Sequence, residues 1–169
     1  MIRWIGGLLV ILGCGGCGIS IAAEYLREQQ RLGRLYRALC IMEWELKYRL
    51  TPLPELCRLA AKEAGGSVGE VLRRLAGELD AQTEPEVDGC MQAALAKVPE
   101  LSPALRKIMK QLGRSLGRFD LTGQIQGLQA VREAVQTAQE RLDRERSSRL
   151  KCYRTLGFCT GAALVILFI

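Results

Sequence analysis

Histidine is absent from all 169 residues, and aromatic residues make up only 5% of the chain. Without imidazole, the chain has neither the usual general base nor the commonest metal ligand. The few aromatics and a net charge of only +6 do not fit a nucleic-acid binder, which combines a clustered basic face with interleaved aromatics. The glycine-rich stretch 65–69 is not followed by Gly-Lys-Ser or Gly-Lys-Thr, so we predict a turn between helices and no nucleotide site. We therefore predict no metal and no cofactor.

Charge is also missing from both ends of the chain. Trp4–Ala23 is an uncharged run of 20 residues, and Thr155–Ile169 is another of 15. At about 1.5 Å per residue, the first run spans the roughly 30 Å core of a bilayer, and the second needs Tyr153 and Arg154 at the interface to reach across. We predict transmembrane helices over residues 1–23 and 153–169, with the lipid bilayer as a partner.

The charged residues set the orientation. All 18 acidic residues, and all 24 basic residues except Arg3, lie within Glu24–Arg154. The stretches next to both uncharged runs are rich in arginine, and cations are retained on the cytoplasmic side of a membrane. We therefore expect residues 24–152 to form a cytoplasmic domain, with both termini across the membrane.

An export signal is the alternative. Ile11-Leu12-Gly13-Cys14 resembles a bacterial lipoprotein cleavage site, and Ser20-Ile21-Ala22-Ala23 resembles an ordinary one. Either would place the domain outside the cytoplasm, as a lipoprotein-type helical binding module anchored through Cys14. The seven scattered cysteines have no metal-ligand pattern and suggest free thiols in a reducing compartment.

The interior is predicted to be helical throughout. A heptad seam of apolar residues marks a first long helix to about Leu50, and a second apolar face marks a last long helix from about Gly123. The members are Leu32, Leu35, Leu39, Met42 and Leu46 in the first, and Ile125, Leu128, Val131, Val135, Ala138 and Leu142 in the last. Two such helices are expected to pair antiparallel. The fold class is all-α, a small helical bundle between two transmembrane helices.

Shorter helices between these two are marked by cap signals. The predicted signals are Thr51 as cap with Pro52 at the first helical position, a capping box of Ser67 and Glu70, Thr83-x-Pro85-Glu86 before Val87–Val98, Ser102-Pro103 before a helix to about Gly117, and Asp120 or Thr122.

Two segments are candidate sites. Glu43 and Glu45 flank Trp44, but residues two apart on a helix face different ways, and Glu43 is expected to pair with Lys47. Gly113 and Gly117 share one helical face, where the cost of glycine in a helix suggests that another backbone comes close. That face is interpreted either as packing within the domain or as a docking groove for a partner, flanked by Arg114 and Arg118.

These segments carry a resemblance to the stage III sporulation protein AB family of endospore-forming bacteria. The matching features are an N-terminal membrane helix, Met42-Glu43-Trp44-Glu45-Leu46 with Tyr48 and Thr51-Pro52-Leu53, Leu112-Gly113-x-x-Leu116-Gly117-x-x-Asp120, and Tyr153-Arg154-x-Leu156-Gly157. The family is similar to the cytoplasmic domain of F-type platform proteins of type II secretion. The resemblance implies a subunit of a channel complex between mother cell and forespore, with a secretion-type ATPase, stage III sporulation protein AA, as partner.

The predicted function is therefore that of a non-enzymatic membrane platform or assembly subunit, which could also form homo-oligomers. A hydrolytic enzyme is a further alternative, but no nucleophile–base pair is visible to support it. The candidate docking or structural residues are Glu43, Glu45, Thr51, Pro52, Leu53, Leu112, Gly113, Arg114, Leu116, Gly117, Arg118 and Asp120.

Overall fold

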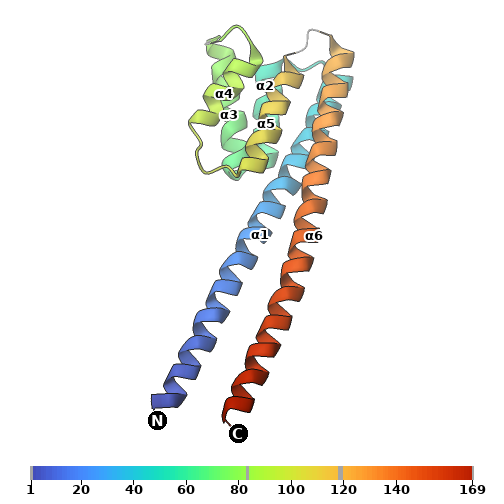
Figure 1. The fold of residues 1–169 in the computed structure, drawn as a ribbon. Coiled ribbons are helices and arrows are strands. Elements are labelled where there is room, and N and C mark those ends of the chain that lie inside the picture. Colours follow the sequence, from blue (N-terminus) through green and yellow to red (C-terminus); the bar gives the residue numbers. More distant parts are fainter. Residues whose placement is uncertain (1, 83, 118–119, 169) are drawn as a thin grey trace. The chain divides into compact units, whose positions relative to one another are not determined.

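The computed structural model describes the backbone of residues 2–82, 84–117 and 120–168, and the side chains of residues 24–82, 84–117 and 120–145. Over this part the chain forms six helices and no strand, which confirms the all-α prediction (Figure 1). The helices are α1 (Ile2–Tyr48), α2 (Leu53–Ala64), α3 (Gly66–Ala81), α4 (Val87–Ala96), α5 (Pro103–Leu116) and α6 (Leu121–Phe168).

The chain divides into two units. One is a bundle formed by Gln29–Gln139, and the other contains the two terminal stretches, Met1–Glu28 and Glu140–Ile169. Among the described residues, none of the helices combines the length and apolar character needed to cross a membrane. The two predicted anchors, residues 1–23 and 153–169, lie outside the residues whose side chains are described.

The two long helices supply one wall of the bundle core. All five members of the predicted heptad seam on α1 are at most 5% exposed, which confirms that prediction. On α6, Leu128, Val131 and Val135 are buried, whereas Ile125 and Ala138 are only partly so. Within the bundle the two helices run antiparallel and side by side, as predicted (Figure 1).

The four short helices complete the core in chain order, with α2 against α3, α3 against α4 and α4 against α5. The turn between α2 and α3 is made by Gly65 and Gly66, whose φ angles of 56° and 52° are left-handed conformations that glycine adopts without steric cost. A Cβ on Gly69 would lie 2.6 Å from the carbonyl oxygen of Ala61, so the glycine lets α3 pass close to α2. The glycine-rich stretch is thus a helix turn, as predicted.

Two of the predicted caps are present. The Ser102 hydroxyl accepts the backbone N–H of Leu105 at 3.2 Å, and Asp120 Oδ2 accepts that of Gly123 at 2.7 Å. Both bonds satisfy donors that have no partner within the helix.

The other cap predictions need correction. Helix α3 begins at Gly66, and Gly65 occupies its N-cap position. The hydroxyl of Ser67 therefore makes no capping bond. Glu70 pairs instead with Arg73 and Arg74, and the predicted capping box is wrong because the left-handed glycines start the helix two residues early, with the N-cap at Gly65. Likewise α4 begins at Val87 without a side-chain cap and ends at Ala96, two residues before the predicted end; Thr83 lies outside the described residues.

Candidate docking surface

The two carboxylates beside Trp44 lie on different faces of α1, as their spacing predicts. Glu43 Oε1 accepts a hydrogen bond from Gln129 Nε2 at 2.7 Å, and Glu43 Oε2 lies 2.8 Å from Arg132 Nη1. The prediction that Glu43 pairs with Lys47 is therefore wrong. An arginine on the neighbouring helix competes successfully because the partly buried contact excludes solvent that would weaken a pair along the helix surface.

Arg132 stays charged at this contact. Burial lowers the pKa of Arg132, but the neighbouring Cys40 side chain and the charge of Glu43 raise that pKa overall. Further along, Gln136 Nε2 donates to the Tyr36 hydroxyl at 3.3 Å. These polar contacts fix the register between α1 and α6 in the bundle.

Glu45 organises the turn from α1 to α2. It is only 7% exposed, and its Oε2 accepts the Thr51 hydroxyl at 2.7 Å, while Arg49 Nη1 lies 3.5 Å from Oε1. The prediction that Thr51 caps α2 is therefore wrong. Pro52 occupies the N-cap position, one residue before the helix begins at Leu53. The buried carboxylate attracts the hydroxyl more strongly than an exposed helix end does, because an unpaired buried charge is costly.

Beside this turn, several side chains project outward from the end of α1. Trp44 and Tyr48 are 48% and 64% exposed, with ring centroids 5.7 Å apart. The Arg49 guanidinium lies 5.1 Å from the Trp44 ring, and Lys47 Nζ lies 5.4 Å from the Tyr48 ring. Leu50 follows at 67% exposure. We call these five residues the Trp44–Leu50 patch.

This patch was not predicted from the sequence. A signal was present, because Trp44 and Tyr48 are four residues apart and fall outside the heptad seam that faces the core.

The glycine-containing face of α5 is packed inside the bundle. Leu112, Gly113 and Leu116 are buried, and a Cβ on Gly113 would lie 2.7 Å from the Cβ of Met91 on α4. Gly117 ends the helix, with its N–H donating to the carbonyl of Gly113 at 3.3 Å. Of the two interpretations, packing within the domain is therefore confirmed for Gly113: a helix of the same chain occupies the space that a partner would have used.

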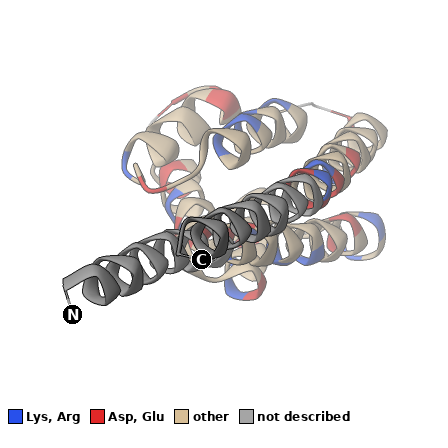
Figure 2. Ribbon diagram, turned by 60° about the horizontal axis from the view of Figure 1, so that its bottom comes forward, with Lys and Arg blue, Asp and Glu red and all other residues tan. Residues whose placement is uncertain are grey.

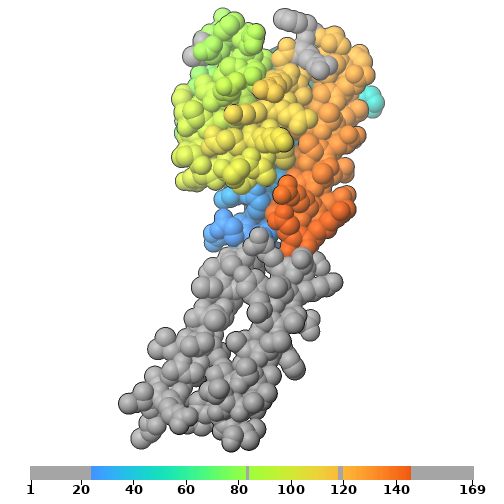
Figure 3. Space-filling model, viewed as in Figure 1, coloured from blue at the N-terminus to red at the C-terminus, as the bar shows by residue number. Residues whose placement is uncertain are grey.

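Three of the four basic residues of α5 lie on its outer face; the fourth, Arg106, donates to the carbonyls of Leu95 and Val98. Lys107, Lys110 and Arg114 are all exposed, and Arg114 Nε lies 3.8 Å from Asp88 Oδ1. Figure 3 shows α5, in yellow, between α4 and α6 on this side of the bundle. Arg118 lies outside the described residues. Elsewhere Lys and Arg are interspersed with Asp and Glu along the described helices (Figure 2).

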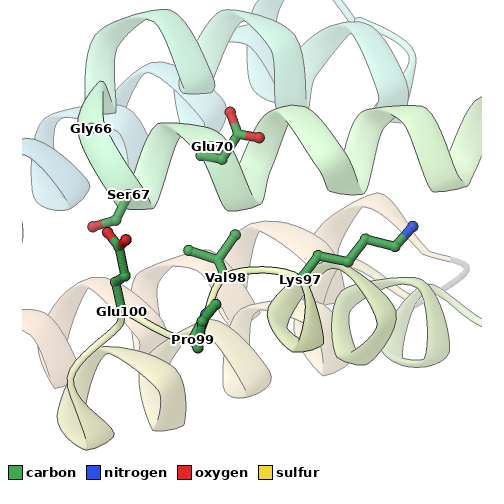
Figure 4. A pocket seen from close by; sticks show the side chains of 7 residues that line it. All are labelled: Gly66, Ser67, Glu70, Lys97, Val98, Pro99 and Glu100. Carbon is green, nitrogen blue, oxygen red and sulfur yellow. The ribbon is translucent and has the colours of Figure 1, made fainter.

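Nothing in the described part of the chain resembles a catalytic centre. A cavity of about 290 Å³ lies between the start of α3 and the loop after α4 (Figure 4). Of its three charged lining residues, Glu70 pairs with two arginines, Lys97 pairs with Glu78, and Glu100 is exposed. No group of three potential metal ligands occurs among the described residues. Burial raises the pKa of the Cys57 thiol to about 12, against a smaller lowering by Arg58, so this thiol is not a nucleophile at neutral pH.

Comparison with known proteins gives a consistent result. The family model described as stage III sporulation protein AB matches residues 3–169. Stage III sporulation protein AB of Bacillus subtilis (strain 168) is 22% identical over 170 residues, which cover 99% of each chain. A solved structure of a stage III sporulation protein AB, 21% identical, has a TM-score of 0.61 and covers 70% of this chain and 94% of its own.

The structural match shows that the fold is shared, and the family match extends over nearly the whole chain, including both uncharged ends. The resemblance found in the sequence motifs is therefore confirmed, and the chain belongs to the stage III sporulation protein AB family.

Proposed function

We propose that this chain is a membrane-tethered, non-enzymatic assembly subunit of a sporulation complex between mother cell and forespore. Its helical bundle lies in the mother-cell cytoplasm, both termini cross the membrane, and the bundle docks a secretion-type ATPase, stage III sporulation protein AA. Membership of the stage III sporulation protein AB family supports the part in sporulation.

One observation supports the proposal that both termini are anchored in the membrane. At the edge of the bundle, α1 and α6 are still paired: a Cβ on Gly33 would lie 3.7 Å from Gln139 Nε2. Both helices therefore leave the bundle at the same end. In sequence, α1 leads back to the uncharged run Trp4–Ala23 and α6 leads on to Thr155–Ile169. An exit at one end is what two anchors in a single bilayer require.

A docking role fits the character of the bundle better than catalysis. The two buried polar residues of the described part, Glu45 and Ser115, both bind groups of the same chain, so neither is aimed at a substrate. The Trp44–Leu50 patch instead presents aromatic and cationic side chains to solvent. Such side chains are typical of protein–protein interfaces. The similarity of the family to F-type platform proteins of type II secretion is the basis for choosing an ATPase as the partner.

Vesicle flotation tests the proposal. The full chain is reconstituted into liposomes, washed with alkaline carbonate, and floated with the purified ATPase. We expect the chain to stay with the vesicles and to carry the ATPase upward, whereas empty vesicles leave it at the bottom. Release of the chain by carbonate would contradict the tether, and an ATPase that stays at the bottom would contradict the partnership. A mature N-terminus at Cys14 would decide for the exported lipoprotein.

A further inference from the structure

Three large apolar side chains remain exposed at one end of α1, and folding does not explain them. Trp44, Tyr48 and Leu50 are 48%, 64% and 67% exposed, so they contribute little to the core. Leu50 also has a φ of 53°, a left-handed conformation in which glycine or asparagine is favoured. An exposed leucine in a backbone conformation that is sterically unfavourable for residues with a Cβ points to a requirement other than stability.

The exposed charges that α1 itself places beside these side chains are of one sign. Arg49 and Lys47 lie over the rings of Trp44 and Tyr48, at 5.1 and 5.4 Å from the ring centroids. Both carboxylates of this stretch are turned away. Glu43 is bound to α6, and Glu45 is buried beneath the turn. The Trp44–Leu50 patch is thus apolar and cationic, with no free carboxylate among residues 43–50.

We propose that the Trp44–Leu50 patch is the surface that binds the ATPase, a step that rests on the proposed function. The partner contributes an acidic face, with carboxylates opposite Lys47 and Arg49 and apolar side chains around Tyr48 and Leu50. Tryptophan, tyrosine and arginine are the residue types that most often anchor protein interfaces. Complementary charge would orient the partner before the apolar groups meet.

The patch fits other occupants less well. In a symmetric dimer the same surface faces itself, so a second copy would bring like charges together. A nucleic-acid base would have to share each ring with a cation that already lies over one of its faces. A membrane surface is also a poor fit, because within the bundle Tyr48 lies roughly 28 Å of helix away from Gln29, at the end of α1 opposite the proposed anchor.

Binding of single-residue variants of the full chain, reconstituted in liposomes, to the purified ATPase tests this assignment. Tyr48→Ala removes an exposed anchor, and Lys47→Glu reverses a surface charge without touching the core. Two matched controls lie outside the patch: Leu121→Ala alters another exposed apolar residue, 40% exposed, and Lys110→Glu reverses an exposed charge on α5. We expect each patch variant to weaken binding at least about tenfold and each control to change it less than about twofold.

The outcomes separate this inference from the proposed function. If the unaltered chain does not bind the ATPase, the proposed partnership is contradicted, and this inference fails with it. Equal binding by all four variants overturns the inference alone, as does a loss confined to Lys110→Glu. The inference is also overturned if the chain self-associates or binds a single-stranded RNA oligonucleotide and Tyr48→Ala abolishes that interaction, because the patch then belongs to another partner.

Discussion

Replacing Gly113 by alanine separates helix propensity from packing, because Gly77 supplies a matched control. Both glycines lie inside short helices, so the change to alanine favours each helix by about 1 kcal/mol. At Gly77 nothing lies within 4 Å of the added carbon. At Gly113 that carbon would lie 2.7 Å from the Cβ and 2.9 Å from the Cγ of Met91.

The cost at Gly113 follows from these distances. Carbon atoms pack at about 3.5–4.0 Å, so α4 and α5 must separate by nearly an ångström. The Cβ of Met91 is fixed to the α4 backbone and cannot rotate away. Overpacking of this kind costs about 1–3 kcal/mol. We expect Gly77→Ala to stabilise the protein by about 1 kcal/mol, and Gly113→Ala to be about 1–3 kcal/mol less stable than Gly77→Ala.

Thermal unfolding of the full chain in detergent, followed by circular dichroism, measures the difference. For a bundle of this size 1 kcal/mol corresponds to roughly 4 °C in Tm, so the two variants should differ by about 4–12 °C. Equal upward shifts in both variants would refute the close packing of α5 on α4. A larger residue at position 113 should lower the Tm further.

Three other perturbations test the bundle. Glu43→Gln should cost about 1 kcal/mol by weakening the contact with α6, and unchanged stability in urea unfolding would contradict the salt bridge. Thr51→Val should cost about 1–3 kcal/mol because it leaves the buried Glu45 short of a hydrogen bond. The control Thr137→Val, in an exposed helix position, should be nearly neutral. Equal costs for the two variants would contradict the role of the turn. In the folded state the Cys57 thiol has a pKa of about 12, whereas in the unfolded chain it has its ordinary pKa of 9.0. Because the folded state then holds more protons, stability falls as the pH rises from about 9 to 12. Cys57→Ala should reduce that fall, and an identical pH profile in urea unfolding would count against it.

The sequence predicts the regular parts of the fold well. The apolar seam of α1 and the caps Ser102 and Asp120 depend on periodicity and on bonds within a few residues, so they are visible in a single sequence. The early start of α3 was missed, because two left-handed glycines override the cap signal that follows them.

Contacts between helices could not be predicted in the same way. Glu43 has a reachable lysine four residues on, but it binds Arg132, which is 89 positions away in the chain. Gly113 was recognised as a close approach, yet its neighbour Met91 becomes known only when α4 is placed. The candidate docking surface was missed for a related reason: periodicity shows which residues leave the core, but the burial of Glu45 and the cations over both rings depend on the folded turn.

The central claim is that the bundle lies on one side of a membrane and both termini lie on the other. Topology mapping tests it most directly, with alkaline phosphatase and a fluorescent protein fused in turn to each terminus and inserted in the loop between α4 and α5. The account predicts an active phosphatase at both termini and a fluorescent insertion in the loop. An active phosphatase in the loop would place the bundle outside the cytoplasm, and fluorescent fusions at both termini would contradict the two anchors.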